Sequence, residues 1–478
     1  MSVELKIKKL TAEEIAEATG GELIEIGKAS SRTVDKVTHD SRECTNGVLF
    51  CAIPGDRVDG HDFIPNAVRD GANVILLDHL PEKTDGLDFI AVKVADTVAA
   101  LGDLAHYYKG LSKAKVIAVT GSVGKTTTKE FIAAVASTSY KTHKTKGNYN
   151  STIGLPLTLF GLDPDDEVAV CEMGMSDFGE IERMSKIAEP DIAVITNIGS
   201  SHLEYLGSRE GICKAKMEIT AGLKKDGTLI LNADEPLLFA KKDDSTVSPE
   251  FVSVYSRFGD YRAVNIRQNA DGMEYDLIYG NKAVTNVTIP TLGKHNVYNS
   301  LIAYAVGVKL GMTDEDIRRG LMSFVSADKR QNIYDVGSIT LIDDCYNASP
   351  ESMHASIDVL TSIASKRGVN PCALLGDMLE LGEYSRLMHD QLGQYAAKAK
   401  VHRLYCYGEM ADVVAEAAIK NGIRADNVSV CLDSKQPETM AKMIAATMED
   451  GDILLVKASR GVAAEKVIEA LKKLPKRK

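Results

Sequence analysis

Short apolar runs alternate with longer amphipathic stretches through the middle of the chain, and the two kinds of segment predict strands and helices in turn. Such alternation is typical of βαβ units on a parallel sheet. Between about 252 and 292 the apolar runs lie closer together, with turn residues between them, so we expect an antiparallel extension of this sheet. The four strand-like runs before it are KVIAVT (115–120), VAVCEMG (168–174), DIAVITNIG (191–199) and TLILNAD (228–234).

Helices are expected after the first of these strands and after the antiparallel region. The first helix is predicted over 129–137, and the second over 296–310, where Gly311 ends it. Near the N-terminus, VLFCAIPG (48–55) predicts a strand and 63–70 a helix.

The last third of the chain alternates again. The apolar runs ITLIDD, CALLGDM, RLYCYG and ILLVKAS are separated by helical stretches, one beginning at Glu351 and one over 387–400. That pattern predicts a second, doubly wound α/β unit. We therefore expect an α/β protein of three domains, over residues 1–112, 113–326 and 327–478. A length of 478 residues favours the same number, at roughly 150 residues per domain.

The composition narrows the class of protein. A hydrophobic fraction of 44% predicts large buried cores, and a formal net charge of −11 argues against nucleic acid, which needs a positive face. No apolar run reaches the ~20 residues of a membrane helix, and the charged N-terminal stretch lacks the apolar core of a signal peptide. The eight cysteines occur singly, which favours reduced, buried thiols over a disulfide or zinc framework. We expect a cytoplasmic protein with neither a membrane nor a nucleic-acid partner.

The strongest local signal is TGSVGKTTT (120–128), which follows a buried strand and opens a helix. Its glycines let the backbone wrap around a phosphate, and the helix N-terminus adds positive potential. The lysine can reach the β- and γ-phosphates, and the hydroxyl after it is placed for Mg²⁺. The alternative is a strand-to-helix turn without a ligand, since Val119 stands where the usual pattern has its first glycine. The ATP-binding residues expected here are Gly121, Ser122, Val123, Gly124, Lys125, Thr126 and Thr127.

Two further residues are candidate Mg²⁺ ligands because they follow strands of the same sheet. Glu172 ends one strand and His202 follows the next, and the carboxyl ends of parallel strands meet at one crevice. Mg²⁺ prefers oxygen ligands, which favours Glu172. Taken alone, His202 is more simply a hydrogen-bonding loop residue.

Several motifs, read in order, resemble those of the Mur ligases of peptidoglycan synthesis. In the first domain, HDSRECTNGVLFCAIPGDRVDGHDF (39–63) looks like the nucleotide-sugar-binding domain of that family. Ser151, Cys345 and Ala458 depart from the family's pattern, and Ser151 leaves one substrate contact open. The other motifs are TGSVGKTTTKE, GNYNSTIGLPLTL (147–159), EMGMSDFGEI (172–181), ITNIGSSHLE (195–204), KAKMEI (214–219), GKHNVYNSLIAYAVG (293–307) and DDCYNASPESM (343–353).

The resemblance implies a three-domain enzyme with a central P-loop ATPase domain and a Rossmann-like C-terminal domain. It implies a cytoplasmic, monomeric ligase that uses ATP and Mg²⁺ in peptidoglycan synthesis, and so serves cell shape and division. A carboxylate would attack the γ-phosphate of ATP, and an amine would displace phosphate from the acyl phosphate. LLGDMLELGEYSR (374–386) is similar to members that join D-alanyl-D-alanine to UDP-N-acetylmuramoyl-tripeptide.

The resemblance also implies a role for individual residues. The catalytic residues would be Lys125, Lys216, His202 and Arg330, and the metal ligands Thr126, Glu172, His202 and Lys216. Beyond the loop, ATP would contact Asn296, Asn299, Arg330 and Asp344. The UDP-sugar peptide would contact Ser41, Arg42, Asn148, Asn150 and Thr152, and the dipeptide Asn347, Lys457, Ser459 and Arg460.

Spacing alone favours plainer interpretations of some of these residues. Lys214 and Lys216 would lie on a solvated helix face, whereas the resemblance makes Lys216 a lysine that CO₂ carbamoylates into a metal ligand. Asn296 and Asn299 would be surface amides on one helix face. Arg460 would be a solvated helix cap.

Other classes of protein also carry a phosphate loop. A GTP-dependent switch needs a guanine-reading motif such as N-K-x-D, which the sequence lacks. A scaffold derived from a decayed ligase would be missing the loop lysine or the metal carboxylate, and both are present. Within the family, the alternative is a ligase that adds a different amino acid, although the D-N-P-R type motif of the diaminopimelate-adding members is absent.

Overall fold

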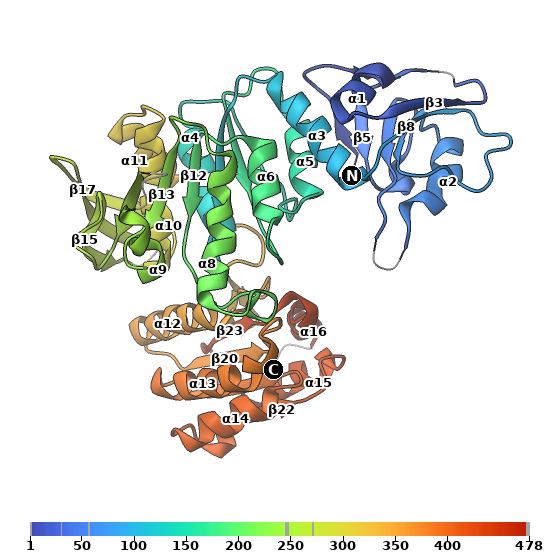
Figure 1. Ribbon diagram of the computed structural model, residues 1–478. Coiled ribbons are helices and arrows are strands. Elements are labelled where there is room, and N and C mark those ends of the chain that lie inside the picture. The colour runs from blue at the N-terminus through green and yellow to red at the C-terminus, as the bar shows by residue number, and fades with distance from the viewer. Residues whose placement is uncertain (1, 30, 56–57, 244–247, 270–271, 475–478) are drawn as a thin grey trace.

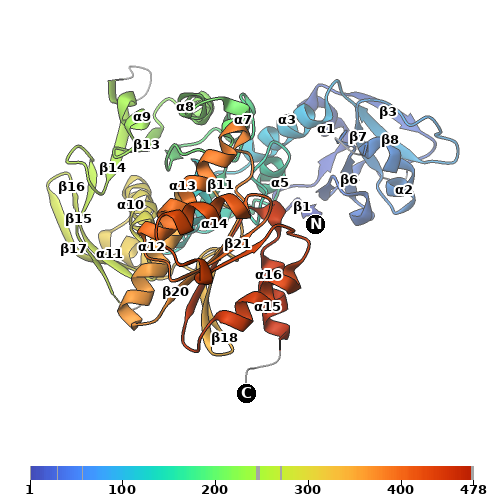
Figure 2. The same ribbon diagram turned by 90° about the horizontal axis from the view of Figure 1, so that it is seen from below.

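The computed structural model describes residues 2–29, 31–55, 58–243, 248–269 and 272–474. The chain forms three α/β domains, each built around its own open sheet (Figure 1). The N-terminal domain lies beside the central one, and the C-terminal domain lies below it in the same view. Figure 2, seen from below, shows the C-terminal domain in front of the central domain.

The N-terminal sheet has the strand order β1-β5-β6-β7-β8-β3, in which β5 to β8 run parallel and the two edge strands run antiparallel. All residues of β6 and β7 are buried, which explains their uniformly apolar sequence. The strand predicted within 48–55 is confirmed, and the predicted helix over 63–70 is α2, preceded by a 3₁₀ turn. The elements are β1 Val3–Glu4, β2 Leu10–Thr11, α1 Ala12–Thr19, β3 Glu22–Ile26, β4 Thr33–Val34, β5 Lys36–Thr38, β6 Val48–Cys51, α2 Ile64–Arg69, β7 Val74–Leu77, β8 Phe89–Lys93 and α3 Thr97–Gly110.

The central sheet has the order β10-β11-β9-β12-β13-β14-β15-β16-β17. Its pairs are parallel from β10 to β15 and antiparallel from β15 to β17, which confirms the predicted antiparallel extension. The strands are β9 Lys115–Thr120, β10 Thr142–Lys144, β11 Val168–Glu172, β12 Ile192–Ile195, β13 Thr228–Asn232, β14 Pro249–Ser253, β15 Tyr261–Gln268, β16 Met273–Tyr279 and β17 Lys282–Ile289. The helices are α4 Lys125–Ala136, α5 Gly154–Phe160, α6 Glu180–Ala188, α7 Leu203–Leu206, α8 Arg209–Met217, α9 Pro236–Phe239, α10 Lys294–Lys309 and α11 Asp314–Met322.

Helix α4 begins four residues earlier than predicted. Gly124 adopts φ 85° and serves as its N-cap, so the phosphate loop leads into the helix without an intervening turn. The first N–H groups of α4 therefore point toward the loop, where an anion would be bound.

The C-terminal sheet has the order β18-β19-β23-β20-β21-β22, with a β18–β19 antiparallel hairpin and parallel pairs beyond it. Helices lie on both faces, which confirms the predicted doubly wound unit (Figure 2). The elements are β18 Asn332–Val336, β19 Ile339–Asp343, α12 Pro350–Arg367, β20 Pro371–Gly376, α13 Ser385–Lys398, β21 Arg403–Tyr407, α14 Ala411–Lys420, β22 Val428–Cys431, α15 Pro437–Thr447, β23 Ile453–Lys457 and α16 Glu465–Lys473.

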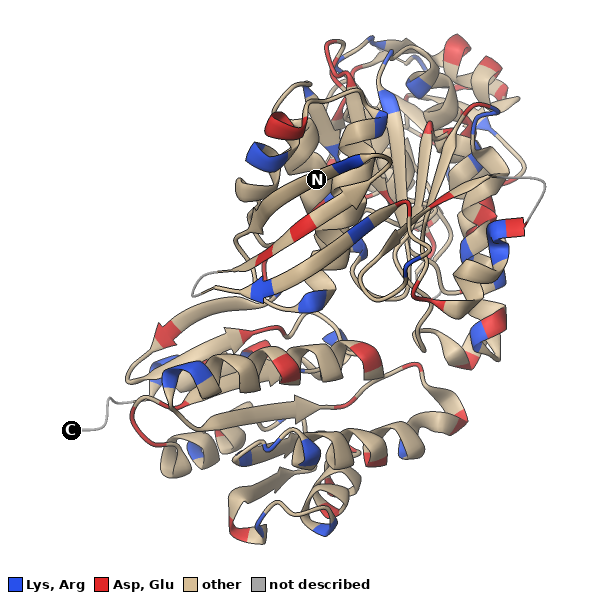
Figure 3. Cartoon of the chain, turned by 90° about the vertical axis from the view of Figure 1, so that its left-hand side faces the viewer, with Lys and Arg blue, Asp and Glu red and all other residues tan. Residues whose placement is uncertain are grey.

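The distribution of charged residues and the burial of the cysteines agree with what the composition predicts. Lys and Arg are interspersed with Asp and Glu over the whole molecule (Figure 3). All eight cysteines are buried and free, as predicted, and burial raises the pKa of Cys51 and Cys406 far above the usual thiol value. In the part of the chain that the structure describes, no helix has the length and apolarity needed to cross a membrane.

Helix α11 packs on α4 so closely that Gly320 has no room for a side chain. A Cβ atom at this position would lie 2.5 Å from the Cα atom of Val135, which is main chain and cannot turn aside. We expect Gly320→Ala to lower the free energy of unfolding by about 1–3 kcal/mol, because overpacking forces the two helices apart. Urea unfolding of the purified protein measures this.

The matched control is Gly110→Ala at the end of α3, where a Cβ atom would meet nothing within 4 Å. This change should be neutral or slightly stabilising, since alanine reduces the entropy of the unfolded chain. Equal urea midpoints for Gly320→Ala and the wild type would show that the helices are not in close contact.

Candidate active site

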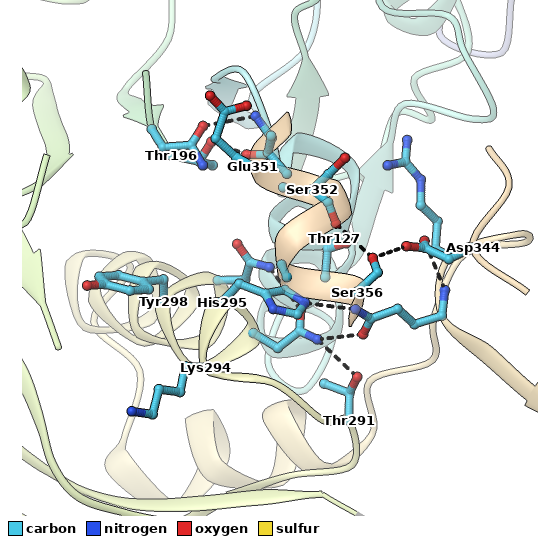
Figure 4. Close-up of a pocket in the computed structure, with 18 of the residues that line it drawn as sticks. Thr127, Thr196, Thr291, Lys294, His295, Tyr298, Asp344, Glu351, Ser352 and Ser356 are labelled. Carbon is cyan, nitrogen blue, oxygen red and sulfur yellow. Dashed lines mark hydrogen bonds between the residues drawn. The ribbon is translucent and has the colours of Figure 1, made fainter. Parts of the chain in front are cut away.

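The carboxyl ends of β9, β11 and β12 meet beside a cavity of about 360 Å³ between the central and C-terminal domains. The phosphate loop forms one side of this cavity through Gly124 and Thr127, and α10 forms another through Asn296 and Asn299. Helix α12 of the C-terminal domain closes it from the opposite side (Figure 4). The cavity therefore lies at the position where an open parallel sheet binds its ligands.

The phosphate loop is shaped by two glycines. Gly121 adopts φ 147° and Gly124 φ 85°, and both are closely approached by polar side chains. A Cβ atom on Gly121 would lie 1.9 Å from Thr196 Oγ1, and one on Gly124 would lie 2.8 Å from Asn299 Oδ1. Only glycine fits either position, so the predicted loop conformation has both a conformational and a steric cause.

Lys125 folds back over this loop. Its Nζ atom donates a hydrogen bond to the carbonyl of Gly121 at 2.8 Å. Burial lowers the pKa of Lys125, and the nearby Arg330 guanidinium lowers it further, against the opposing effect of Glu172. A phosphate in the loop would supply the counter-charge that this ammonium lacks.

Two residues that the sequence analysis did not single out fix the loop to the end of β12. Asn197 Oδ1 accepts a hydrogen bond from the Val123 N–H at 2.9 Å, and Thr196 Oγ1 donates to the Val123 carbonyl at 2.6 Å. Both belong to the ITNIG segment, which the sequence analysis treated as a strand end and as part of a family motif without giving either residue a role. Polar residues directly after an apolar strand were the available signal.

Glu172 ends β11 and is only 2% exposed. Its Oε1 atom accepts hydrogen bonds from Thr126 Oγ1 at 3.2 Å and Asn150 Nδ2 at 2.9 Å. Its Oε2 atom is buried and has no hydrogen-bond partner among the described residues. A buried carboxylate with an unused oxygen, next to a threonine hydroxyl, fits an Mg²⁺ ion, which prefers oxygen ligands.

Lys129 is a buried cation beside this carboxylate, and the sequence analysis took it only as the start of a helix. Its Nζ atom donates to the Thr145 carbonyl at 2.9 Å and lies 3.0 Å from Glu130 Oε1 and 3.8 Å from Glu172 Oε2. The side chain is 1% exposed. The ammonium therefore offsets part of the cost of burying Glu172.

Lys216 lies on α8 and is 1% exposed, whereas Lys214 on the same helix is exposed. The solvated-face interpretation is therefore wrong for Lys216 and right for Lys214, because α8 turns residue 216 toward the core. Burial lowers the pKa of Lys216 well below its usual value, and the charge of Lys125 adds to this effect. No ion pair joins Lys216 to a carboxylate within the described ranges.

His202 follows β12 and adopts φ 63°. Its Nδ1 atom lies 2.7 Å from Oε2 of Glu380, which belongs to the C-terminal domain. The described residues show no hydrogen bond between His202 and Lys216, so their shared metal position stays a prediction.

The nucleotide contacts predicted outside the loop do lie around the cavity. Arg330 Nη2 donates to Thr126 Oγ1 at 3.3 Å, and its guanidinium stacks 4.2 Å from the ring centre of Tyr346. Asn299 accepts from Thr128 Oγ1 at 3.0 Å and donates to Asn296 Oδ1 at 3.0 Å. Both asparagines are buried, so the surface-amide interpretation is wrong.

The C-terminal domain adds a buried polar network to the cavity (Figure 4). Asp344 Oδ2 accepts from Ser356 Oγ and from Lys457 Nζ, each at 2.6 Å. Gln331 Nε2 donates to His295 Nε2 at 3.0 Å, and burial lowers the pKa of His295. His295 is the first residue of the H-N-x-x-N stretch and was not predicted as a site residue.

Of the four residues predicted for the dipeptide, two are buried and two are exposed. Lys457 is occupied by Asp344 and also donates to the Asn347 carbonyl at 3.1 Å. Ser459 is buried, and its hydroxyl accepts from the Leu379 N–H at 3.0 Å. Asn347 and Arg460 are exposed. Their roles toward a dipeptide stay predictions.

The residues predicted for the UDP-sugar peptide lie in two places. Ser41 and Arg42 belong to a 3₁₀ turn of the N-terminal domain, where Arg42 pairs with Asp40 and lowers the pKa of that carboxyl to about 2. Asn148 is exposed and Thr152 half-buried in the segment before α5. Asn150 instead orients Glu172.

One other group of side chains has the composition of a metal site, namely Asp59, His61 and His79 in the N-terminal domain. Both ring nitrogens of His61 are already engaged, Nδ1 with Asp59 Oδ1 at 2.6 Å and Nε2 with the Asp78 N–H at 3.2 Å. An ion would have to displace both, so this group is better explained as a structural network.

The fold and the site together define an ATP-dependent ligase of the P-loop type, and comparison with known proteins agrees. Residues 33–135 match the catalytic domain of the Mur ligase family, 119–307 the Mur ligase middle domain and 329–460 the Mur ligase glutamate ligase domain. The chain belongs to the Mur ligase family.

Several of its relatives carry the same name. The UDP-N-acetylmuramoyl-tripeptide--D-alanyl-D-alanine ligase of Bacillus subtilis is 38% identical over 98% of this chain and 99% of its own length. The ligase of the same name from Escherichia coli is 33% identical over 97% and 98%. The crystal structure of MurF from Acinetobacter baumannii superposes with a TM-score of 0.87 at 30% identity, over 98% of this chain and 99% of that one. MurF ligase from Thermotoga maritima in complex with ADP gives 0.79 at 31% identity, over 91% and 97%.

The position of Lys125 makes it the first residue to test. We expect Lys125→Ala to lower nucleotide turnover by about 10²–10³-fold, since the ammonium serves phosphate charge and not the core. Steady-state release of phosphate measures the rate, and circular dichroism checks the fold. Lys113→Ala, an exposed lysine before β9, is the control and should match the wild type. A Lys125→Ala enzyme with a tenth or more of the wild-type rate would contradict the phosphate-loop assignment.

Proposed function

We propose that this protein joins D-alanyl-D-alanine to UDP-N-acetylmuramoyl-tripeptide with ATP, giving UDP-N-acetylmuramoyl-pentapeptide, ADP and phosphate. The observation that carries the proposal is the cavity in which the phosphate loop, through Gly124 and Thr127, faces Arg330 and Asp344. The named relatives, which match over nearly their full length, supply the substrates. The pathway is peptidoglycan precursor synthesis, and the enzyme acts as a cytoplasmic monomer that supports cell shape and division.

The chemistry follows from where the cations lie. The acceptor carboxylate attacks the γ-phosphate, and the resulting acyl phosphate is attacked by the dipeptide amine, with loss of phosphate. Three anionic groups must approach one another, so positive groups have to stabilise the developing charge. Lys125 would reach the phosphates from the loop. Arg330, which follows α11 in the chain, donates a hydrogen bond to Thr126 next to Lys125 and would reach the same phosphates.

Thr126 and Glu172 are the residues that would hold a first Mg²⁺ ion, and the unused Glu172 Oε2 supports this fit. Bound Mg²⁺ would neutralise charge on the phosphate oxygens. His202 and Lys216 would hold a second ion.

The role of Lys216 requires a change in its charge. A protonated lysine repels a metal ion, but Lys216 is buried without a carboxylate partner in the described structure, and its pKa is lowered. Burial therefore favours the neutral amine, which is the form that attacks CO₂. The nitrogen lone pair bonds to the carbon of CO₂ and the nitrogen loses a proton, which leaves a carbamate anion. The side chain then offers oxygen ligands in place of a cation.

The three domains divide the substrates in chain order. We assign residues 1–112 with Ser41 and Arg42 to the UDP-sugar, 113–326 to ATP, and 327–478 to the dipeptide through Asn347, Lys457, Ser459 and Arg460. Asn148, Asn150 and Thr152 would guide the acceptor peptide toward the phosphate loop. This division is supported by the separate large sheet in each segment.

Phosphate release over a grid of UDP-muramyl peptides and amine donors tests the function. We expect rapid release only when UDP-N-acetylmuramoyl-tripeptide and D-alanyl-D-alanine are both present, since the acyl phosphate needs both a carboxylate and an amine. Preference for a single amino acid over the dipeptide would point to a different Mur ligase. Equal turnover without either substrate would point to a nucleotide switch.

Lys216 and Lys214 form a matched pair for the carbamate. Lys216→Ala should reduce ligase activity by at least about 10²-fold, with partial rescue by short carboxylic acids that occupy the vacated space. Lys214→Ala should be nearly silent, because this side chain is exposed. Activity in CO₂-depleted buffer measures the dependence on the modification. Equal losses for the two variants, or an active Lys216→Ala enzyme, would return Lys216 to a structural role.

A further inference from the structure

A loop of the C-terminal domain docks on the loop that carries His202. Glu380 follows β20, and its Oε2 atom lies 2.7 Å from His202 Nδ1. The Glu204 N–H donates to the Glu380 carbonyl at 3.4 Å. Gly382 lies so close that a Cβ atom there would be 3.3 Å from the Cβ of Glu204. The two loops, from different domains, therefore fit each other by a close carboxylate–imidazole contact, a backbone hydrogen bond and direct packing.

The backbone at the centre of this contact is strained on both sides. His202 has φ 63° and Glu380 has φ 62°, although neither is glycine. A left-handed conformation is unfavourable for a non-glycine residue, because the Cβ atom comes too close to the following carbonyl oxygen. Strain of this kind persists where the surroundings enforce it and is concentrated at functional sites. Here it turns the imidazole and the carboxylate toward each other across the domain boundary.

The group that faces one ring nitrogen of His202 determines whether the other nitrogen can bind a metal ion. With Nδ1 facing Glu380, the tautomer that carries its proton on Nδ1 is favoured, and the lone pair is then on Nε2. A metal-binding histidine commonly has a carboxylate on its second nitrogen, which fixes the ring and raises its basicity. The contact of Nδ1 with Glu380 is close but is not aligned as a hydrogen bond. The described residues show no hydrogen bond to Nε2, so this nitrogen is free to act as a ligand.

We propose that Glu380 is a positioning residue for His202, delivered by the C-terminal domain. It sets the orientation of the imidazole, so that the second metal position is complete only when this domain has docked. The inference rests on the proposed function, in which His202 holds a metal ion. It gives the LELGEY segment a physical role, namely to couple docking of the third domain to assembly of the site.

Manganese binding measured by electron paramagnetic resonance, in the presence of a non-hydrolysable ATP analogue, tests this without relying on activity. We expect the wild type to bind a tight and a weaker Mn²⁺ ion. Glu380→Gln keeps the shape of the side chain and removes its charge, and it should weaken the second ion by 10–100-fold. The first ion, at Thr126 and Glu172, should bind as before, which also shows that the variant is folded.

Three further variants make the result specific. Glu383→Gln removes an exposed carboxylate from the same segment and should bind both ions as the wild type does. His202→Asn should abolish the weaker site. The double variant His202→Asn with Glu380→Gln should match His202→Asn alone, because Glu380 acts through His202.

The outcomes distinguish an error in the second metal position from an error in the role of Glu380. If His202→Asn leaves both ions bound, the second metal position of the proposed function is wrong, and this inference with it. If His202→Asn removes the weaker ion but Glu380→Gln does not weaken it, only the role of Glu380 is overturned. A double variant that also loses the tight ion would overturn it too, since Glu380 would then act independently of His202.

Discussion

The buried carboxylate of Glu172 is the interaction on which the geometry of the site depends. A carboxylate that is only 2% exposed is costly to bury unless its oxygens are paired. Thr126 and Asn150 satisfy Oε1, and the Lys129 ammonium lies near Oε2 while it also binds the Thr145 carbonyl. Thr145 in turn accepts the Glu172 N–H. These bonds connect α4, the residue after β10 and the end of β11, and so they fix the phosphate loop relative to the strand end that carries Glu172.

The rest of the site comes from outside the central sheet, and this has a physical reason. A cavity that must bring an acceptor, a triphosphate and an amine together has to admit them separately, so its walls belong to different domains. Arg330 and Asp344 approach the loop from the C-terminal side, and Glu380 reaches His202 from the same side. Holding the reacting groups in place supplies a large part of the rate enhancement of such a reaction. Docking of the third domain is therefore part of the chemistry and not only a means of excluding water.

The sequence predicted those features that depend on local pattern. The parallel strands, the antiparallel extension, the doubly wound last domain and the glycines of the loop all follow from periodicity or from backbone conformation. The start of α4 was placed too late, because Gly124 in a left-handed conformation caps the helix and the pattern of Lys125 to Thr128 is polar. Lys129 and Asn197 were missed, since a helix lysine and a loop asparagine have no local signature of burial. Spacing alone placed Lys216 on a solvated face, because periodicity defines faces of a helix but not which face meets the core.

The positive charges around the cavity determine how the site would respond to a bound triphosphate. Burial lowers the pKa values of Lys125 and Lys216, and a neighbouring cation lowers each of them further, Arg330 for Lys125 and Lys125 for Lys216. A triphosphate would reverse the balance of charge in the cavity, because its charge exceeds what Lys125 and Arg330 can neutralise. Under the proposed function, divalent ions would then be needed, and Lys216 as a carbamate would provide an anionic ligand for one of them. A neutral amine is required for that reaction, so the burial of Lys216 and the charge of Lys125, which both lower its pKa, would favour the modification that the proposed function requires.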